Sequence, residues 1–485
     1  MTSTADNPES TVSLDSLFTP PSRDQWIEMA MAGLRGEKSD MDALQQLRRT
    51  TLEGIPLEVL YDSADVPINS PFSDKSANGL DNRLCVKADD PIQASRNILQ
   101  GLQGGITSIE LRTCKPADIP TVLSGVQLNL ATVSLRALDQ YEVCLQALLE
   151  LVSAQGHDRS TWYCCVNADP ISVALASGAN ETELRKQLKN VARFTKNTSS
   201  SLPSVKCLLV DVALHHNAGA STVEELHAAL ATATLYLESL LDAGISLEDA
   251  CEQIVFQIAM DADVLLGVAK LRALKALWQI VVDQFSSGST KHKPATIVAE
   301  TSQRFLSILQ PWNNHLRNLC ASTAALLGGA DTLMVHPHDA LQRSDKNPDT
   351  TLGDRMARNM AIILERECGL DNVHDPMSGS YAIESLTHQL MQYTWQSLAS
   401  TDTGEGWINE LLSERWQTRL TNTHNQRTTL MQREQRIAVG VNRFIQTDEK
   451  VHTLIHPTST TSSHALTAVR DADAFEQSAV QEASS

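Results

Sequence analysis

The sequence is 485 residues long, with 42% hydrophobic and 20% charged residues and a formal net charge of −19. This is an ordinary globular composition, and the length allows one very large domain or two to three ordinary ones. The negative charge argues against nonspecific binding of nucleic acids and against docking on anionic membranes. No apolar run approaches the roughly 20 residues that span a bilayer.

Two further features of the sequence bear on its compartment. The N-terminus is polar and acidic and has no apolar core, so we expect neither a signal peptide nor a transit peptide. The nine cysteines are scattered and form no CxxC pair, which argues against structural zinc of the usual spacing. An odd, scattered set of cysteines without a secretion signal is typical of a reducing compartment. The sequence therefore predicts a cytoplasmic protein.

The first part of the chain carries weak signals of structure. Residues 1–17 are rich in Ser, Thr and Asp and are predicted to be disordered. Residues 18–82 are predicted to form a helical and extended N-terminal arm, with helical patterns first and an extended stretch at 51–61. The arm has too few apolar residues to fold alone.

From about residue 83 the sequence alternates between short apolar segments and longer helical patterns. The short segments are predicted strands at 84–86, 106–111, 128–135, 162–167, 205–214, 254–259, 296–300 and 332–335. They are apolar throughout, as strands buried on both faces of a parallel sheet are. About eight such units predict an α/β protein whose residues 83–445 form a (β/α)8 TIM barrel, with an open sheet as the alternative. The chemistry of a barrel would lie at the carboxyl ends of its strands.

The stretch 353–395 combines a helix, a turn and a second helix. Apolar residues recur at helical spacing up to Gly369, which stands where a left-handed C-cap residue belongs. Residues 372–374 are then predicted to be a short, final barrel strand, followed by a polar turn and a second helix from Tyr381. After it, residues 446–485 are predicted to be a flexible C-terminal tail with a short helix at 465–480.

Three pairs of polar residues that contain histidine follow predicted strands: His215 with His216, His336 with His338, and His374 with Asp375. Neutral histidine acts as an acid or base near pH 7 or as a metal ligand. His215, His336 and His374 would suit a metal-dependent barrel hydrolase if they converged. Histidines that follow strands more often have a surface or packing role.

Other candidate residues have plainer alternatives. Asp211 and Glu300 lie in or at the ends of apolar strands, where a buried acid can have a raised pKa but is more often a hydrogen-bonded structural group. Arg355 and Arg358 share a helix face and could hold phosphate or pair with neighbouring acids. The motifs GxxxxGK[ST], GxGxxG and GxSxG are absent, so nucleotide cradling and a nucleophile elbow have no support.

Several segments together resemble the methylmalonyl-CoA mutase family. They include TLEGIP at 51–56, AGA at 218–220, AKLRA at 269–273, LGGA at 327–330 and RMARN at 355–359. The stretch HDPMSGSYAIESLT at 374–387 continues the resemblance, which covers about residues 18–445. It implies a (β/α)8 barrel, in agreement with the alternation above, and in the family such a barrel is followed by a cobalamin-binding α/β domain.

The sequence departs from the family pattern at the residues of its chemistry. Alignment on 218–220 puts Ala213 and Leu214 at the family's Tyr-His positions, with His215 and His216 as weak substitutes. The Tyr- and Arg-rich segment ahead of the family barrel is missing from 71–84, and no DxHxxG cobalt-ligand motif is present. We therefore expect the cobalamin-binding C-terminal domain to be absent and no residue of this chain to be catalytic, cofactor-binding or metal-binding.

The resemblance implies the small, non-catalytic subunit of a heterodimeric methylmalonyl-CoA mutase. Adenosylcobalamin and the CoA ester substrate would then be bound by the large catalytic mutase subunit, and the arm at 18–82 would contact that partner. The alternatives are an active acyl-CoA mutase barrel served by a separate cobalamin-binding protein, and the metal-dependent barrel hydrolase.

Overall fold

The computed structural model describes residues 21–33, 48–66, 79–112, 114–136, 140–286, 294–342, 351–401, 405–446 and 465–477. The chain divides into two compact units, Met1–Tyr61 and Asp62–Ser485. Within the described residues, no helix is both long and apolar enough to cross a membrane.

The first unit contains one helix and one small sheet. Helix α2 spans Arg23–Gly33, and strand β1 (Arg49–Thr50) pairs antiparallel with β2 (Pro56–Leu57). Gly54 takes a positive φ in the turn between the two strands, a conformation that glycine adopts at little cost. The arm is predicted to span residues 18–82, whereas this unit ends at Tyr61. The predicted disorder of residues 1–17 lies outside the described residues.

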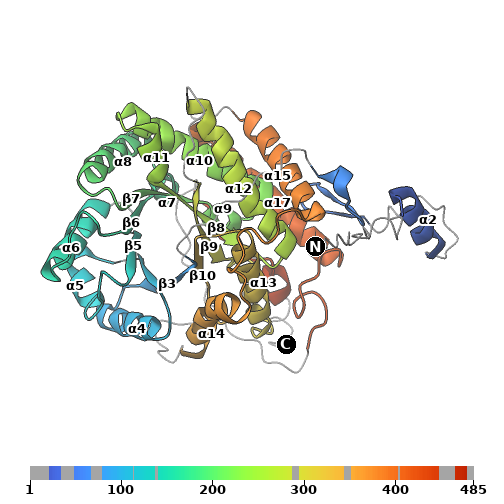
Figure 1. Ribbon diagram of the computed structural model, residues 1–485, viewed down its shortest axis with the longest axis horizontal. Helices are drawn as coiled ribbons and strands as arrows, with labels where there is room; N and C mark the ends of the chain where they lie inside the picture. The colour runs from blue at the N-terminus through green and yellow to red at the C-terminus, as the bar shows by residue number, and fades with distance from the viewer. Residues whose placement is uncertain are drawn as a thin grey trace, which may run out of the picture. The chain divides into compact units, whose positions relative to one another are not determined.

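The second unit is a closed parallel barrel of eight strands in the order β10-β3-β4-β5-β6-β7-β8-β9 (Figure 1). The strands are β3 (Asp81–Lys87), β4 (Ser108–Arg112), β5 (Thr132–Arg136), β6 (Cys164–Ala168), β7 (Val205–Asp211), β8 (Ile254–Met260), β9 (Thr296–Thr301) and β10 (Thr332–Met334). The predicted (β/α)8 barrel is confirmed.

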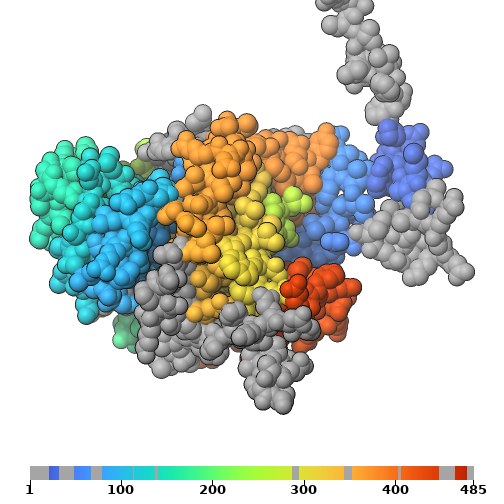
Figure 2. Space-filling model, turned by 90° about the horizontal axis from the view of Figure 1, so that it is seen from below, coloured from blue at the N-terminus to red at the C-terminus, as the bar shows by residue number. Residues whose placement is uncertain are grey.

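Helices surround this barrel and cover its strands (Figure 1). They are α4 (Pro91–Gln103), α5 (Ile119–Val122), α6 (Tyr141–Ala154), α7 (Pro170–Ser177), α8 (Glu181–Ser201), α9 (Ala213–Asn217), α10 (Thr222–Asp242), α11 (Leu247–Glu252), α12 (Val264–Phe285), α13 (Asn313–Leu327), α14 (Thr351–Ile362), α15 (Tyr381–Ala399), α16 (Glu405–Leu412) and α17 (Arg415–Gln432). Short 3-10 segments at Ser63–Asp65 and Pro116–Asp118 and a π-helical turn at Ile363–Glu367 complete the set. Figure 2 shows one face of the surface, where blue side chains of the first barrel helices adjoin orange ones of later helices.

Several predicted strands have shifted bounds, such as Thr132–Arg136 in place of 128–135, and two differ from the structure in kind. The strand predicted at 205–214 ends at Asp211, and the residues after it form the short helix α9. Residues 372–374 are bends rather than a barrel strand, and the next residue, Asp375, has a φ of 41° that no strand can continue. The last barrel strand is β10, which pairs with both β9 and β3 and so closes the ring.

The prediction of a flexible tail over 446–485 is wrong for residues 465–477, which have a defined structure. This segment lies against the barrel loops, because the Val469 N–H donates to the Asn217 carbonyl at 2.8 Å and the Asp471 N–H donates to the Arg304 carbonyl at 3.0 Å. Of the helix predicted within it, the described residues show the part at 473–477. The remaining tail residues lie outside the described part of the chain.

The interior of the barrel is filled in layers. Cys165, Leu209, Val255 and Val298, from four successive strands, pack together as one apolar layer. Two residues further along their strands, on the same face, Asp211, Gln257 and Glu300 form a polar layer with partners from across the barrel. The barrel is therefore a packed core with a charged upper layer.

Candidate functional site at the carboxyl end of the barrel

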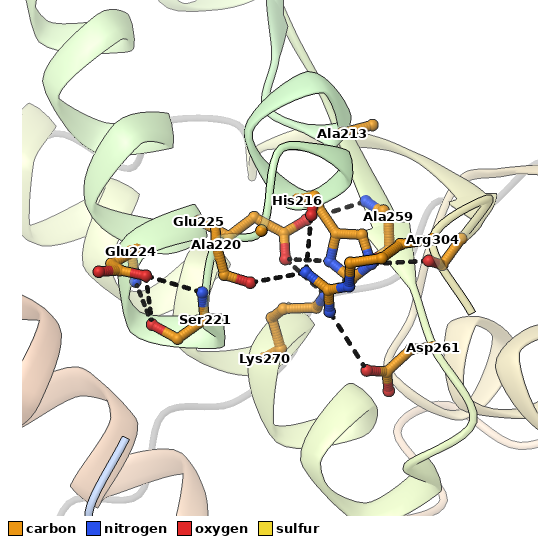
Figure 3. A network of polar contacts seen from close by, with 12 residues as sticks. Ala213, His216, Ala220, Ser221, Glu224, Glu225, Ala259, Asp261, Lys270 and Arg304 are labelled. Atoms are coloured by element: carbon orange, nitrogen blue, oxygen red, sulfur yellow. Dashed lines mark hydrogen bonds and ion pairs between the residues drawn. The ribbon is translucent and has the colours of Figure 1, made fainter. Parts of the chain in front are cut away.

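The loops after β7, β8 and β9 bring the predicted site residues together. Helix α9 follows β7, Asp261 follows β8, and Ser302 and Arg304 follow β9. Figure 3 shows how the side chains of His216, Asp261 and Arg304 converge from these loops. The carboxyl ends of parallel strands share one edge, so these loops meet although up to 91 residues separate them.

The positions assigned by resemblance to a Tyr-His pair carry aliphatic side chains. Ala213 is buried, and its N–H donates to Asp211 Oδ1 at 3.1 Å. Leu214 is 41% exposed. Neither side chain can give or take a proton, so these two positions supply no acid or base.

His216 is held by hydrogen bonds on both ring nitrogens. Its Nε2 lies 2.7 Å from Ser302 Oγ and its Nδ1 lies 3.3 Å from Glu225 Oε2. Burial lowers its pKa well below the usual value, and the positive charges of Arg304 and Lys270 lower it further. The imidazole is therefore neutral at physiological pH, and both of its nitrogens are occupied.

The Ser302–His216–Glu225 chain has the order of a serine–histidine–acid triad. Each of the three side chains is buried, and Ser302 has no exposed surface. Glu225 also accepts from Lys270 Nζ at 2.9 Å and from the Ala259 N–H at 3.0 Å. None of these three side chains is more than 3% exposed, so together they form a buried hydrogen-bond network (Figure 3).

His215 points into an aromatic cluster on the other side of α9. Trp416 Nε1 donates to the Nδ1 of His215 at 2.8 Å. The ring of Trp407 packs against His215, and the ring of His227 packs against Trp416. His227 Nδ1 lies 2.8 Å from Ser397 Oγ. Burial lowers the pKa of His215 to about 4 and, together with Arg419 and His215, that of His227 to about 3. Both histidines are thus neutral core residues.

Two buried arginines hold the turn that follows α9. Arg304 Nη1 donates to the carbonyls of His216 at 2.6 Å and Ala220 at 2.8 Å. Arg427 donates to the carbonyls of Gly219 at 3.2 Å and Ala220 at 3.1 Å. Sequence reasoning missed both, because neither a lone arginine in the turn after a strand nor one on a polar helix is marked by its sequence as buried.

Gly219→Ala is expected to destabilise the protein by about 2 kcal/mol or more. Gly219 has a φ of 112°, and an added Cβ would lie 2.9 Å from both His424 Cβ and the Leu420 carbonyl oxygen. Urea unfolding measures the change. Gly156→Ala is the control, since Gly156 also has a positive φ but meets nothing within 4 Å, and an equal loss in both variants would contradict the steric explanation.

The upper layer of the barrel interior is crossed by ion pairs. Arg136 binds Asp211 at 2.5 Å and Gln257 at 2.8 Å, and Arg112 lies 3.3 Å from Glu300. Burial raises the pKa of Asp211 to about 6 despite Arg136. Burial also raises the pKa of Glu300. The hydrogen bond and charge of His336, together with the charges of Arg112 and Arg136, outweigh this effect and lower the pKa to about 2. Asp211 and Glu300 are thus buried structural acids.

The three histidines of the metal-site hypothesis do not meet. His215 lies in the aromatic cluster, His336 bonds to Gln303 at 3.1 Å, and His374 is exposed on the loop after α14. No group of three His, Cys, Asp or Glu residues that could hold a metal occurs in the described part of the chain. The geometry gives the hydrolase hypothesis no support.

Arg355 and Arg358 lie on α14, away from the loops that follow β7 to β9. Arg355 is exposed, and the Arg358 carbonyl accepts from Asn82 Nδ2 at 3.1 Å. The guanidinium of Arg358 packs closely over Gly104, where a Cβ would collide with it. No phosphate site emerges around these two residues.

The stretch 353–395 is anchored to α12 by a buried ion cluster. Arg272 pairs with Asp375 through Nη1 and with Glu384 at 2.8 Å through Nη2, and all three side chains are almost completely buried. Glu384 also accepts from the Gly379 N–H at 3.0 Å. The three charged residues lie in the segments that carry the family resemblance, so those motifs here serve the fold.

Comparison with known proteins agrees with this architecture. The family model for methylmalonyl-CoA mutase matches residues 103–483. The methylmalonyl-CoA mutase small subunit of Streptomyces virginiae is 30% identical over 97% of this chain and 78% of its own length. That of Propionibacterium freudenreichii subsp. shermanii is 28% identical over 85% and 66%, and a probable small subunit of Mycobacterium bovis is 31% identical over 64% and 50%. This chain belongs to the methylmalonyl-CoA mutase family.

Proposed function

We propose that this chain is the non-catalytic small subunit of an adenosylcobalamin-dependent methylmalonyl-CoA mutase. In this proposal a large homologous subunit binds the cofactor and the CoA ester, and the present chain stabilises it. The names of the relatives support a subunit role. The support for a non-catalytic role comes from the barrel.

The filled barrel interior is the observation that carries the proposal. A radical rearrangement of a CoA ester needs a closed, water-free cavity and a positioned acid. Here the space inside the carboxyl end is occupied by two arginines paired with Asp211 and Glu300. Clearing it would leave buried charges unpaired, which costs about 3–5 kcal/mol for each broken pair. The same interior that stabilises the barrel thus opposes a substrate cavity.

The histidines near the missing Tyr-His pair are poor substitutes for a catalytic acid. His215 accepts from Trp416, and His216 bonds to Ser302 and Glu225. Both are at least 97% buried, and both favour the neutral form. This argues against an active barrel served by a separate cobalamin-binding protein.

The residues at the carboxyl end do not fit a resident cobalamin. Both ring nitrogens of His216, the Nε2 of His336 and the Nδ1 of His215 already have hydrogen-bond partners, so a cobalt ion could not take them without breaking these bonds. The charged side chains there pair with one another across the barrel. The cofactor in our proposal therefore sits on the partner subunit.

Activity measurements on the separate and combined subunits test the proposal. The purified chain, mixed with adenosylcobalamin and methylmalonyl-CoA, should form no succinyl-CoA and retain no cobalamin absorbance after gel filtration. The large subunit should keep its activity longer at elevated temperature when this chain is present. Isomerisation by the chain alone, or identical inactivation of the large subunit with and without it, would contradict the proposal.

The N-terminal arm is our candidate for contact with the partner. Its helix α2 and small sheet belong to one compact unit, and Met29 and Val59 are 72% and 43% exposed. Deletion of residues 1–61 is expected to weaken association with the large subunit by at least tenfold, measured by analytical ultracentrifugation. The barrel's own melting temperature serves as the control, and unchanged association would refute the role of the arm.

A further inference from the structure

The C-terminal segment 465–477 is fastened at two places beside the barrel mouth. One is the pair of backbone hydrogen bonds from Val469 and Asp471 to the loops after β7 and β9. The other is Glu476, whose Oε1 accepts from Ser307 Oγ and the Ile308 N–H, both at 2.9 Å. The segment is therefore docked by specific polar contacts.

Asp471 places its carboxylate between two buried guanidinium groups. Its Oδ1 lies 3.6 Å from Arg304 Nε and 3.8 Å from Arg427 Nη1. Arg304 and Arg427 are 3% and 2% exposed, and each also holds the turn at Ala220. Two cations from distant parts of the chain thus share one carboxylate.

The contacts of this carboxylate are longer than hydrogen bonds. Arg304 Nε, Arg427 Nε and Asp471 Oδ1 are buried atoms with no hydrogen-bond partner among the described residues. A buried donor without a partner costs about 1–3 kcal/mol. Arg304 therefore has an unused Nε donor 3.6 Å from the Asp471 carboxylate, and Arg427 has an unused Nε donor while its Nη1 lies 3.8 Å from the same oxygen.

Apart from Asp471, the carboxylate nearest to Arg304 is shared with another arginine, so it compensates the positive charge of Arg304 only in part. Asp261 lies 3.9 Å from Arg304 and also 3.7 Å from Arg436, so it is shared with a third cation. Burial and the charge of Arg304 lower the pKa of Arg427 to about 9, while Asp471 acts in the opposite direction. Removing the carboxylate would leave two neighbouring guanidinium groups poorly compensated in a buried position.

We propose that Arg304 and Arg427 form a buried anion site at the carboxyl end of the barrel, which the chain fills with its own Asp471. The site suits a single carboxylate or a small oxyanion, because two guanidinium groups present planar donors to it. It links the C-terminal segment to the Gly219–Ala220 turn, since the same arginines bind both. This inference concerns the chain by itself and does not depend on the proposed function.

Chemical rescue tests the site. Asp471→Ala is expected to lower the apparent melting temperature by about 3 °C. Sodium formate, acetate or phosphate should recover at least half of this loss with a saturable concentration dependence, while sodium chloride at equal ionic strength should not. Rescue by formate and acetate alone would identify a carboxylate site, and rescue by phosphate as well would identify a general oxyanion site.

Three further variants separate the anion site from other effects. Glu434→Ala removes an exposed carboxylate, 3.0 Å from Arg443, and should neither lose stability nor respond to formate. The double variant Arg427→Met with Asp471→Ala should lose the response to anions. If Asp471→Ala does not fold, Asp471→Asn is measured in its place. An unchanged melting temperature, or equal anion effects in the native chain and all variants, would overturn the proposal.

Discussion

Arg272→Met is expected to lower the free energy of unfolding by about 3–5 kcal/mol, because it leaves two buried carboxylates without their cation. Asp375 and Glu384 both pair with Arg272, and neither side chain is more than 2% exposed. The methionine fills a similar volume, so the loss reports charge and not a cavity. Guanidinium chloride unfolding followed by circular dichroism measures the change.

Two companion variants define the source of this effect. Arg272→Lys keeps the charge but lacks the fork that reaches Asp375 and Glu384 together, so an intermediate loss is expected. Arg366→Met breaks an ion pair with Glu365 at 3.4 Å in which Arg366 is 75% exposed, and it should change stability little. A similar small effect of Arg272→Met would mean that the cluster does not anchor the stretch 353–395.

The stability of the protein is expected to fall by about 4 kcal/mol between pH 7 and pH 5 through His215 and His227 alone. Their pKa values in the folded protein are about 4 and about 3, against 6.5 without perturbation. The unfolded chain therefore binds more protons than the folded one in this range, and stability decreases as the pH falls below 6.5. Urea midpoints measured at intervals between these pH values follow the loss.

Replacing the two histidines separates their contribution from that of other groups. The double variant His215→Asn with His227→Gln should be less stable at pH 7 but should show a shallower pH dependence, by about 4 kcal/mol across the range. His388→Gln, on the partly exposed face of α15, is the control and should keep the native slope. An unchanged slope in the double variant would show that the two imidazoles are not held neutral.

The barrel could be predicted from the sequence because its signal is local. Each strand is a short apolar run, and each of the longer helices has its own apolar periodicity and often its own cap, such as Asp90 before α4 or Ser221 before α10. Residues 372–374 misled because Val373 between polar neighbours looks like a strand edge. Asp375 ends this possibility with its left-handed backbone, and its buried partner Arg272 lies 103 residues away, which no local pattern reports.

The candidate site could be predicted only in part, since burial decides what its residues do. The order of His215 and His216 after a strand placed them correctly at the carboxyl end of the barrel. Their partners Trp416, Ser302 and Glu225 come from elements 9 to 201 residues away, so sequence spacing gave no indication that both rings are enclosed. The same holds for Arg427, which reaches the Ala220 carbonyl across 207 residues.

The seam between β3 and β10 has a consequence for how the protein is made. These are the first and last strands of the barrel, and only two residue pairs join them in register. Thr332 Oγ1 donates to Asp81 Oδ2 across 251 residues of chain. A growing polypeptide cannot close this ring until β10 has left the ribosome. The barrel therefore stays open while about 250 residues between β3 and β10 are synthesised. We expect this seam to form last in folding and to exchange its amide hydrogens first.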